Sequence, residues 1–585
     1  MEQKHYYTDE RNAQIVIALL KAHGIKRVIA SPGSTHMSFL GSAEYDSWFQ
    51  IWSAVDERHA AYMALGMAAE TGEPVVLTCT GSTASRNYLP ALTEAFYRKI
   101  PILVITGSQV VAHKGNLFSQ FIDRSSPPPD AIKLSLPCPP VENEREAREC
   151  ELAVNKAILE LFRKGGGPVH INLETSYDRG FSTQELPSVR KLHRYSAEDK
   201  LPGLSESAKI AVFIATHKPF TVRQQNALNG FLQAHNAVAI CQATSSWAGE
   251  KRVFGGLVCA QGIRQNPAYA TLKPDLVIMI GGACNDYPIL GYFSGLAPTW
   301  YVSEDGEAGD RFGMLEKVFE MPESIFFERY ADGQGTSSYY QAWLEADAKL
   351  RTKFPELPFS NLWIAHETMP RLSEDDVLHI GLSTALQSWS AFLCDCKAKV
   401  CSNAATCGID GCVSTLIGAS LSNERNLYFG VVGDLTFFYD MNSLGNRHVG
   451  KNLRLLVVNN GCGGLFHVPG HVQEKFTDVL DDYMAAGGHF GAKSPELVKH
   501  YVTDLGFKYL SATDKESFTK ALPEFLDVNS DKPIVFECFV DVNDDRAACG
   551  ARTSIDRYAP PHTLKGEIKK MVPQGVKNVI QSLIR

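Results

Sequence analysis

Two polar turns in the last third of the chain place oxygen ligands where they could share one metal ion. Asp434 follows the apolar segment 428–432, and Asn460 follows the apolar segment 453–458. The two residues are 26 positions apart. This is enough chain for a turn, a helix, a strand and a second turn, so both side chains are expected at neighbouring strand ends. Either turn alone would be ordinary, but the pair at this spacing favours a ligand site.

A site made only of oxygen ligands suits Mg²⁺. A carboxylate, an amide oxygen and a backbone carbonyl, completed by diphosphate oxygens and water, form the octahedron that this ion prefers. Glycines in the same turns would let the backbone approach phosphate groups closely. These glycines are Gly433, Gly461, Gly463 and Gly464. The two turns therefore predict a magnesium and diphosphate site.

Short apolar segments alternating with helical patterns must position these turns. Each apolar segment is four to six residues long and ends in small polar residues, a pattern typical of buried parallel strands. The rhythm recurs three times, which predicts an α/β fold of three doubly wound parallel sheets. The predicted strands are 27–30, 74–79, 101–105, 210–214, 276–280, 377–380, 428–432 and 453–458, and the clearest helices are 12–23, 56–69 and 88–98.

The predicted domains follow this rhythm. The first spans residues 1–183, the central one 196–345 and the last 360–545, followed by a tail at 546–585. The polar segment 183–195 is interpreted as a linker.

Composition excludes several classes of function. The chain has 585 residues and a net charge of −8, so neither nucleic acid nor an anionic membrane is an expected partner. Charged residues interrupt the first thirty positions, and no run of eighteen apolar residues occurs. A cytoplasmic protein is therefore expected. The crowded cysteines 394, 396, 401, 407 and 412 show no CxxC pair or nearby histidine, which favours buried thiols over a metal cluster.

The two metal-binding turns also carry a family resemblance. They resemble the diphosphate-binding motif of thiamine-diphosphate-dependent enzymes, and in particular the menaquinone-biosynthesis synthase that joins 2-oxoglutarate to isochorismate. The resemblance covers the first and last thirds well, whereas the middle is similar only in architecture. The segments that carry it are GDLTFFYDMNSL, LLVVNNGCGGLF, SPGSTHMSFL, VDERHAAYMALGMA, CTGSTASRNYLPALTEAFYRKIPILVITG and CGIDGCVST.

The resemblance implies pyrimidine-binding, central and diphosphate-binding domains, with thiamine diphosphate and Mg²⁺ as cofactors. Asp434, Asn460 and the carbonyl of Cys462 would hold the metal. Glu57 would promote the imino tautomer of the aminopyrimidine, which takes the C2 proton, and Ile409 would prop the cofactor in its bent shape. Other residues implied to contact the cofactor are Gly81, Ser82, Thr83, Asn87, Ser383, Gly433, Leu435, Thr436, Gly463 and Gly464. Because the family builds its site from two subunits, a homodimer or a dimer of dimers is implied.

The chain departs from the synthase where the latter carries arginines. Thr35, Gln109, Gln387 and Ala404 stand at those positions, while Gln120 and Ser383 are kept. Each lost guanidinium removes a charge-assisted contact of about 1.5–3 kcal/mol to a carboxylate. These departures predict a short, pyruvate-like 2-oxo acid as donor.

Several residues could act on the substrate. His36 is interpreted either as an acid–base residue or as a partly buried loop histidine bonded to backbone. Ser34 and Gln120 are further catalytic candidates. The predicted substrate-binding residues are Ser34, His36, Gln109, Gln120, Gln387 and His467, and Arg86 and His113 are additional candidates.

The preferred function is a carboligase that decarboxylates a 2-oxo acid and transfers the resulting acyl carbanion to an acceptor, which the sequence does not identify. A simple 2-oxo acid decarboxylase and the menaquinone-pathway synthase itself remain as alternatives. A non-catalytic cofactor-binding homologue is disfavoured because Glu57, Asp434 and Asn460 are all present.

Overall fold

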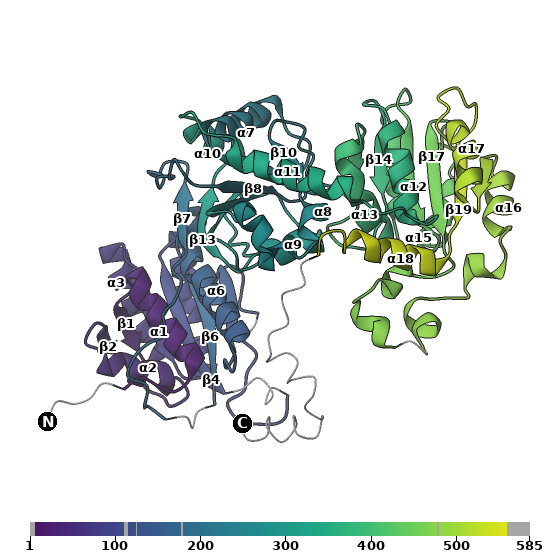
Figure 1. Ribbon diagram of the computed structural model, residues 1–585. Helices are drawn as coiled ribbons and strands as arrows, with labels where there is room; N and C mark the ends of the chain where they lie inside the picture. The colour runs from purple at the N-terminus through teal and green to yellow at the C-terminus, as the bar shows by residue number, and fades with distance from the viewer. Residues whose placement is uncertain (1–5, 110–114, 125, 177–179, 477–478, 558–585) are drawn as a thin grey trace, which may run out of the picture. The chain divides into compact units, whose positions relative to one another are not determined.

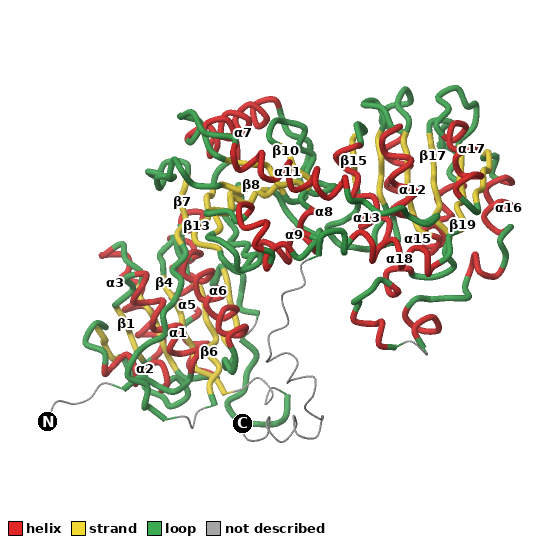
Figure 2. The backbone as a smooth tube through the Cα atoms, in the orientation of Figure 1, coloured by secondary structure: helices red, strands yellow, loops and turns green. Residues whose placement is uncertain are grey.

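Three parallel sheets form the framework of the protein (Figure 1). The computed structural model describes residues 6–109, 115–124, 126–176, 180–476 and 479–557, and its named strands pair in parallel within sheets of six, seven and six strands. Helices accompany the strands of each sheet (Figure 2). The predicted α/β class with three parallel sheets is confirmed. In the described part of the chain, no helix is long and apolar enough to cross a membrane.

The first sheet has the strand order β2-β1-β3-β4-β6-β5. Alternate residues of its strands face opposite sides, as a pleated strand requires. Val28 and Val76 pack with α1 and α6 on one face, whereas Ile29 and Leu77 pack with α3 and α5 on the other. Its elements are α1 (Arg11–His23), β1 (Arg27–Ala30), α2 (Met37–Tyr45), β2 (Gln50–Ser53), α3 (Glu57–Thr71), β3 (Val75–Cys79), α4 (Thr83–Asn87), α5 (Leu89–Arg98), β4 (Ile102–Gln109), β5 (Leu134–Cys138), α6 (Glu144–Glu160) and β6 (Val169–Thr175).

The third sheet repeats the strand order of the first. Its order is β15-β14-β16-β17-β19-β18, the same pattern with later strand numbers. The predicted strands in this region lie within one residue of β14, β16 and β17. Its elements are α12 (Asn361–Thr368), β14 (Val377–Ile380), α13 (Thr384–Trp389), β15 (Lys399–Cys401), α14 (Cys412–Ser420), β16 (Tyr428–Gly433), α15 (Asp434–Asp440), β17 (Leu453–Asn459), α16 (Leu497–Asp504), β18 (Lys508–Ala512), α17 (Lys515–Phe525), β19 (Ile534–Phe539) and α18 (Val542–Arg552).

The middle sheet has a different order, β10-β9-β8-β11-β12-β13-β7. Its first six strands follow the order of doubly wound nucleotide folds, and β7 is added at the edge. β7 includes the last residues of the predicted linker 183–195, so that segment ends in a strand. The elements are β7 (His193–Ser196), β8 (Ile210–Ile214), α7 (Val222–Ala234), β9 (Ala237–Cys241), β10 (Arg252–Phe254), α8 (Gly256–Cys259), β11 (Leu276–Ile280), α9 (Tyr287–Phe293), β12 (Thr299–Ser303), β13 (Leu315–Glu320), α10 (Glu323–Arg329) and α11 (Ser338–Thr352).

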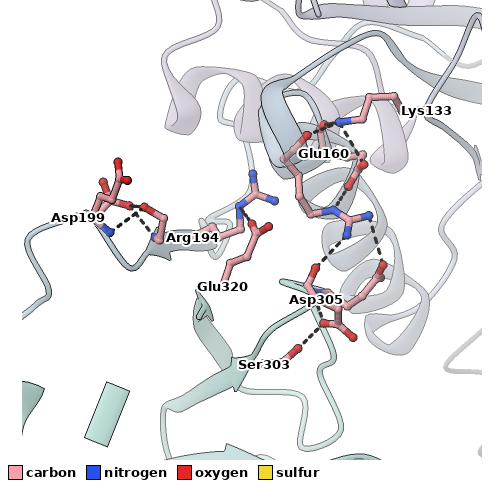
Figure 3. A network of polar contacts seen from close by, with 11 residues as sticks. Lys133, Glu160, Arg194, Asp199, Ser303, Asp305 and Glu320 are labelled. Carbon is pink, nitrogen blue, oxygen red and sulfur yellow. Dashed lines mark hydrogen bonds and ion pairs between the residues drawn. The ribbon is translucent and has the colours of Figure 1, made fainter. Parts of the chain in front are cut away.

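The chain divides into two compact units. One comprises Met1–Leu201 with Thr299–Met321, and the other comprises Pro202–Pro298 with Pro322–Arg585. Within the first unit, Arg163 lies in the 3₁₀ turn Arg163–Gly165 that follows α6. It pairs with Glu160 and Glu307, and its guanidinium donates to the Asp305 carbonyl at 2.9 Å (Figure 3). Lys133 extends this network, with 3.3 Å between its Nζ and Oε1 of Glu160. These contacts fasten the segment after β12 to α6.

A close backbone approach shapes the first sheet's site edge. The loop after β1 crosses Gly107 in β4, where a built Cβ would lie 2.3 Å from the Thr35 carbonyl oxygen and 2.4 Å from His36 Cα. Only glycine leaves room for this crossing. Thr35 Oγ1 reinforces it, because it donates to the Gly107 carbonyl at 2.9 Å and accepts from the Gly81 amide at 3.0 Å. The ends of β1, β3 and β4 are thus held together.

Gly107→Ala is expected to lower the free energy of unfolding of the first sheet by about 1–3 kcal/mol, because the added methyl group must displace backbone. Gly66→Ala is the matched control. Gly66 lies within α3 with no atom near a built Cβ, so this substitution should raise the free energy of unfolding by roughly 0.5–1 kcal/mol. Urea titrations read by hydrogen-exchange mass spectrometry would resolve peptides of β1 and β4. Equal effects of the two substitutions would contradict the role given to Gly107.

Candidate active site

A cavity of about 190 Å³ opens at the carboxyl ends of β14, β16 and β17. Every residue of the last third that the family resemblance implied to contact the cofactor or metal lines it, whereas Gly461, the other glycine of the turn, does not. These residues are Ser383, Ile409, Gly433, Asp434, Leu435, Thr436, Asn460, Cys462, Gly463 and Gly464. The structure therefore brings the two predicted turns together, as the strand-end argument required.

Asp434 is the charged centre of this cavity. The register pairs Gly433 of β16 with Val458 of β17, so Asp434 and Asn460 both lie just beyond the paired segments. Asp434 is 2% exposed, and burial raises the pKa of its carboxyl to about 7, with a smaller contribution from the nearby Glu537 carboxylate. The side chain thus lacks the water that would stabilise its charge, and a cation would restore that stabilisation.

Asn460 is oriented by a residue that the sequence analysis did not identify. Its Nδ2 donates to Oδ2 of Asp545 at 3.3 Å. Because a carboxylate only accepts, this contact assigns the amide nitrogen to Asp545. Oδ1 accepts from the Cys462 main-chain amide at 3.3 Å and keeps a second lone pair for a ligand. Asp545 itself is buried and accepts from the Asn361 amide at 2.6 Å, and burial raises its pKa to about 6. Asp545 is therefore a positioning residue.

The turn after β17 is fixed by a second carboxylate. Nδ2 of Asn459 donates to Oε1 of Glu537 at 2.7 Å, and the Gly461 amide donates to Oδ1 of Asn459 at 3.1 Å. Gly464 completes the turn, since a built Cβ there would lie 2.5 Å from Nδ2 of Asn460. These contacts hold the Asn460 side chain against the turn that follows it.

The donor set of the cavity fits a hard divalent cation. Asp434 offers a carboxylate, Asn460 an amide oxygen and the turn its carbonyls, while no lysine, arginine or histidine among the described residues lines the cavity. A diphosphate entering such a site needs a metal between its own charge and that of Asp434. The residues present therefore fit Mg²⁺ bound together with a diphosphate.

The first sheet carries the predicted pyrimidine-side residues. Glu57 is half-buried at the first position of α3, behind the Asp56 cap, whose side chain accepts from the His59 amide at 2.9 Å. Gly81 is buried after β3, while Thr83 and Asn87 are exposed on α4. All these positions belong to one unit of the chain.

Two predicted cofactor residues share a strained backbone. Ser82 has φ 64° and ψ −135°, and Ser383 has φ 62° and ψ −127°. Each follows a strand and precedes a short helix. Such conformations cost about 1–3 kcal/mol in residues other than glycine and are concentrated at functional sites. The strain is consistent with the cofactor-binding roles predicted for both serines.

His36 lies deeper than either interpretation of the sequence expected. It is fully buried, its Nδ1 lies 2.9 Å from Oγ1 of Thr78, and the backbone of Gly33 also forms a hydrogen bond with it. Burial lowers the pKa of His36 to about 4, which keeps the ring neutral at pH 7. The geometry favours a structural role over acid–base chemistry. Ser34 and Gln120, the other catalytic candidates, are both exposed.

The predicted substrate residues fall in separate places. Gln109 lines a 230 Å³ cavity in the first unit together with Arg124, whose Nε and Nη1 are buried without a hydrogen-bond partner among the described residues. Gln387 lines a larger cavity in the second unit. Arg86 donates to the Asp123 carbonyl at 2.8 Å. His113 lies outside the described residues.

His467 turns toward an acidic side chain. Its Nε2 lies 2.8 Å from Oδ1 of Asp481, and the Cys462 thiol completes a group whose ligand atoms all lie within 4.8 Å of one another. Among the described residues, no three of the crowded cysteines 394–412 form such a group.

The first unit contains a recognised cofactor-binding region. Residues 11–126 match the family model described as "Thiamine pyrophosphate enzyme, N-terminal TPP binding domain". The chain is also 30% identical to a 2-succinyl-5-enolpyruvyl-6-hydroxy-3-cyclohexene-1-carboxylate synthase of Bacteroides thetaiotaomicron, over 96% of this chain and all of that protein. The chain belongs to the thiamine-diphosphate-dependent enzymes.

Other relatives carry the same description. The Bacteroides fragilis synthase is 30% identical over 96% of this chain and all of its own length. The Christiangramia forsetii synthase is 29% identical over 91% of this chain and 97% of its own. Both similarities extend through the middle domain, where the sequence analysis noted only similar architecture.

Removing the buried carboxylate of Asp434 is expected to abolish metal binding while the protein still folds. Asp434→Ala should abolish Mg²⁺-dependent binding of thiamine diphosphate in calorimetry, because the metal ion that links the diphosphate to the protein loses its carboxylate ligand. Asp545→Asn should weaken binding by about 10–100-fold, as is typical when a residue that orients a metal ligand is changed. Asp544→Asn, the neighbouring position with the same change of charge, is the control and should bind normally. Unchanged affinity in Asp434→Ala would refute the assignment.

Proposed function

We propose that the protein is a Mg²⁺-dependent carboligase that removes CO₂ from a 2-oxo acid and joins the remaining acyl group to an acceptor. The observation that carries the proposal is the cavity in which Asp434 and Asn460 converge at neighbouring strand ends, with Asp545 orienting the amide. Family membership supplies the cofactor, and this cavity supplies a place for its diphosphate.

The chain's own residues divide the work. Asp434, Asn460 and the Cys462 carbonyl would hold Mg²⁺, Thr436 would contact the diphosphate, and Ile409 would support the bent cofactor from the cavity wall. When bound, thiamine diphosphate supplies the thiazolium that accepts the electron pair released by decarboxylation. Glu57, at the start of α3, would exchange a proton with the pyrimidine ring of a cofactor shared between two subunits, so we propose a homodimer.

The first candidate reaction is that of the relatives, whose names specify a succinyl product. The similarity spans the whole of the Bacteroides protein, which supports the same pairing of 2-oxoglutarate with isochorismate here. Two of the altered positions also support it. Thr35 is 8% exposed within a hydrogen-bond network and Ala404 is 2% exposed, so their small side chains belong to the packing of the domains.

The second candidate is a carboligase or decarboxylase for a short 2-oxo acid such as pyruvate. The observation in its favour is that Gln109 and Gln387, at positions where the synthase has arginines, both line cavities. A neutral amide there neutralises no distal carboxylate, whose desolvation would cost several kcal/mol.

Donor competition decides between them. We expect kcat/KM for 2-oxoglutarate to exceed that for pyruvate by about a hundredfold, since charge-assisted contacts worth about 3 kcal/mol correspond to that ratio. Mass spectrometry should detect the succinyl adduct when isochorismate is present, and Asp434→Ala should form none. Preferred turnover of pyruvate would establish the second candidate instead, and aldehyde release without an acceptor would identify a simple decarboxylase.

A further inference from the structure

A second cavity, of about 350 Å³, adjoins the diphosphate cavity within the same unit. The two share Leu382, Ser383 and Leu465 as wall residues, so the larger cavity begins where the smaller one ends. Its volume is in the range of small-molecule sites, roughly 300–1,000 Å³. The larger cavity is therefore placed to receive the part of a substrate that extends away from the cofactor.

Arg552 supplies a buried cation to this cavity. It is the last residue of α18 (yellow in Figure 1), a helix that packs on α12 and on the 3₁₀ turn Gly464–His467 beside the diphosphate site. The residue is only 7% exposed. Its backbone is held in place because Nε2 of Gln261 donates to the Arg552 carbonyl at 2.9 Å. The guanidinium is thus positioned by the fold.

The guanidinium is incompletely satisfied. Nη1 donates to the Gln387 carbonyl at 2.8 Å, but Nε is buried without a hydrogen-bond partner in the described chain. Among the same residues, no carboxylate oxygen lies within ion-pair distance, 4.0 Å, of Arg552. A buried, unpaired guanidinium is costly, and its planar fork matches a carboxylate. An anionic ligand in the cavity would neutralise this charge.

Asp286 is the acidic residue that shares this cavity. Its Oδ1 accepts from the Ile289 amide at 3.1 Å, which commits it to the N-terminus of α9. Burial raises the pKa of the Asp286 carboxyl, and the positive charge of Arg552 opposes that shift. The two groups therefore interact electrostatically, but they do not form an ion pair. Arg552 therefore keeps an unpaired charge in the wall of the cavity.

We propose that Arg552 binds the distal carboxylate of the 2-oxo acid donor. This inference rests on the proposed function and names the residue by which the site would select a donor with a second carboxylate. Gln387 contributes through its main chain, because its carbonyl orients the guanidinium, so the neutral amide at that position does not remove the cation from the pocket. The cation reaches it from α18 instead.

Two donors of equal length test the inference: 2-oxoglutarate, and 2-oxopentanoate, which lacks the distal carboxylate. Wild-type holoenzyme should prefer 2-oxoglutarate. Arg552→Gln should lower kcat/KM for 2-oxoglutarate by about 10–100-fold, mainly through KM, and leave 2-oxopentanoate within about twofold. Arg552→Lys should retain part of the preference. Arg546→Gln, an exposed arginine on the same helix, is the control for lost charge.

Binding measurements separate this inference from the proposed function. Calorimetry with thiamine diphosphate and Mg²⁺ should give the same cofactor affinity for Arg552→Gln and wild type. Titration of both donors into the Glu57→Gln background reads carboxylate recognition without turnover. If the Glu57→Gln/Arg552→Gln double variant binds 2-oxoglutarate more weakly but 2-oxopentanoate as before, the inference is supported. An absence of turnover in the wild-type protein would overturn only the proposed function. Equal losses for both donors, or none, would overturn the role of Arg552.

Discussion

The parallel pairing of β16 with β17 is the constraint on which the rest of the site depends. It ends both strands at one edge, so that Asp434 and Asn460 lie beyond the same pair of strands. Burying Asp434 is unfavourable by itself, and the nearby Glu537 carboxylate adds negative charge. The arrangement becomes favourable when a divalent cation is bound. In the proposed assignment, metal affinity and the position of the cofactor's diphosphate would therefore both follow from one strand register.

The same plan of strands is used twice. The first and third sheets share one strand order, and predicted site residues follow corresponding strands in the two: Gly81 and Ser82 follow β3 in the first sheet, and Asp434 follows β16 in the third. The two sheets carry different chemistry at those ends. The first offers Glu57 and the strained Ser82, whereas the third offers the predicted metal ligands and the strained Ser383. The shared strand order places the predicted site residues at strand ends in both sheets, and the identity of the side chains determines which part of the cofactor each sheet would bind.

The sequence predicted the parts of this account that depend on local patterns. Buried parallel strands are short apolar runs, so β14, β16 and β17 were predicted to within a residue, and the turns after them carried the cofactor residues into one cavity. Asp545 and Arg552 were missed because both lie on an ordinary amphipathic helix, in a region assigned to the domain end and tail. Their partners, Asn460 and Gln387, are 85 and 165 residues away in sequence. The depth of His36 was equally unpredictable, since it depends on the crossing at Gly107.

The most direct test of the central claim is hydrogen–deuterium exchange at C2 of thiamine diphosphate bound to the protein. With Mg²⁺, the wild-type protein should accelerate this exchange far beyond the rate of free cofactor. Glu57→Gln, which is nearly isosteric but cannot pass the proton, should bind the cofactor and slow exchange on the order of 10²-fold or more. Wild-type exchange in Glu57→Gln, or no acceleration by the wild-type protein, would contradict the account.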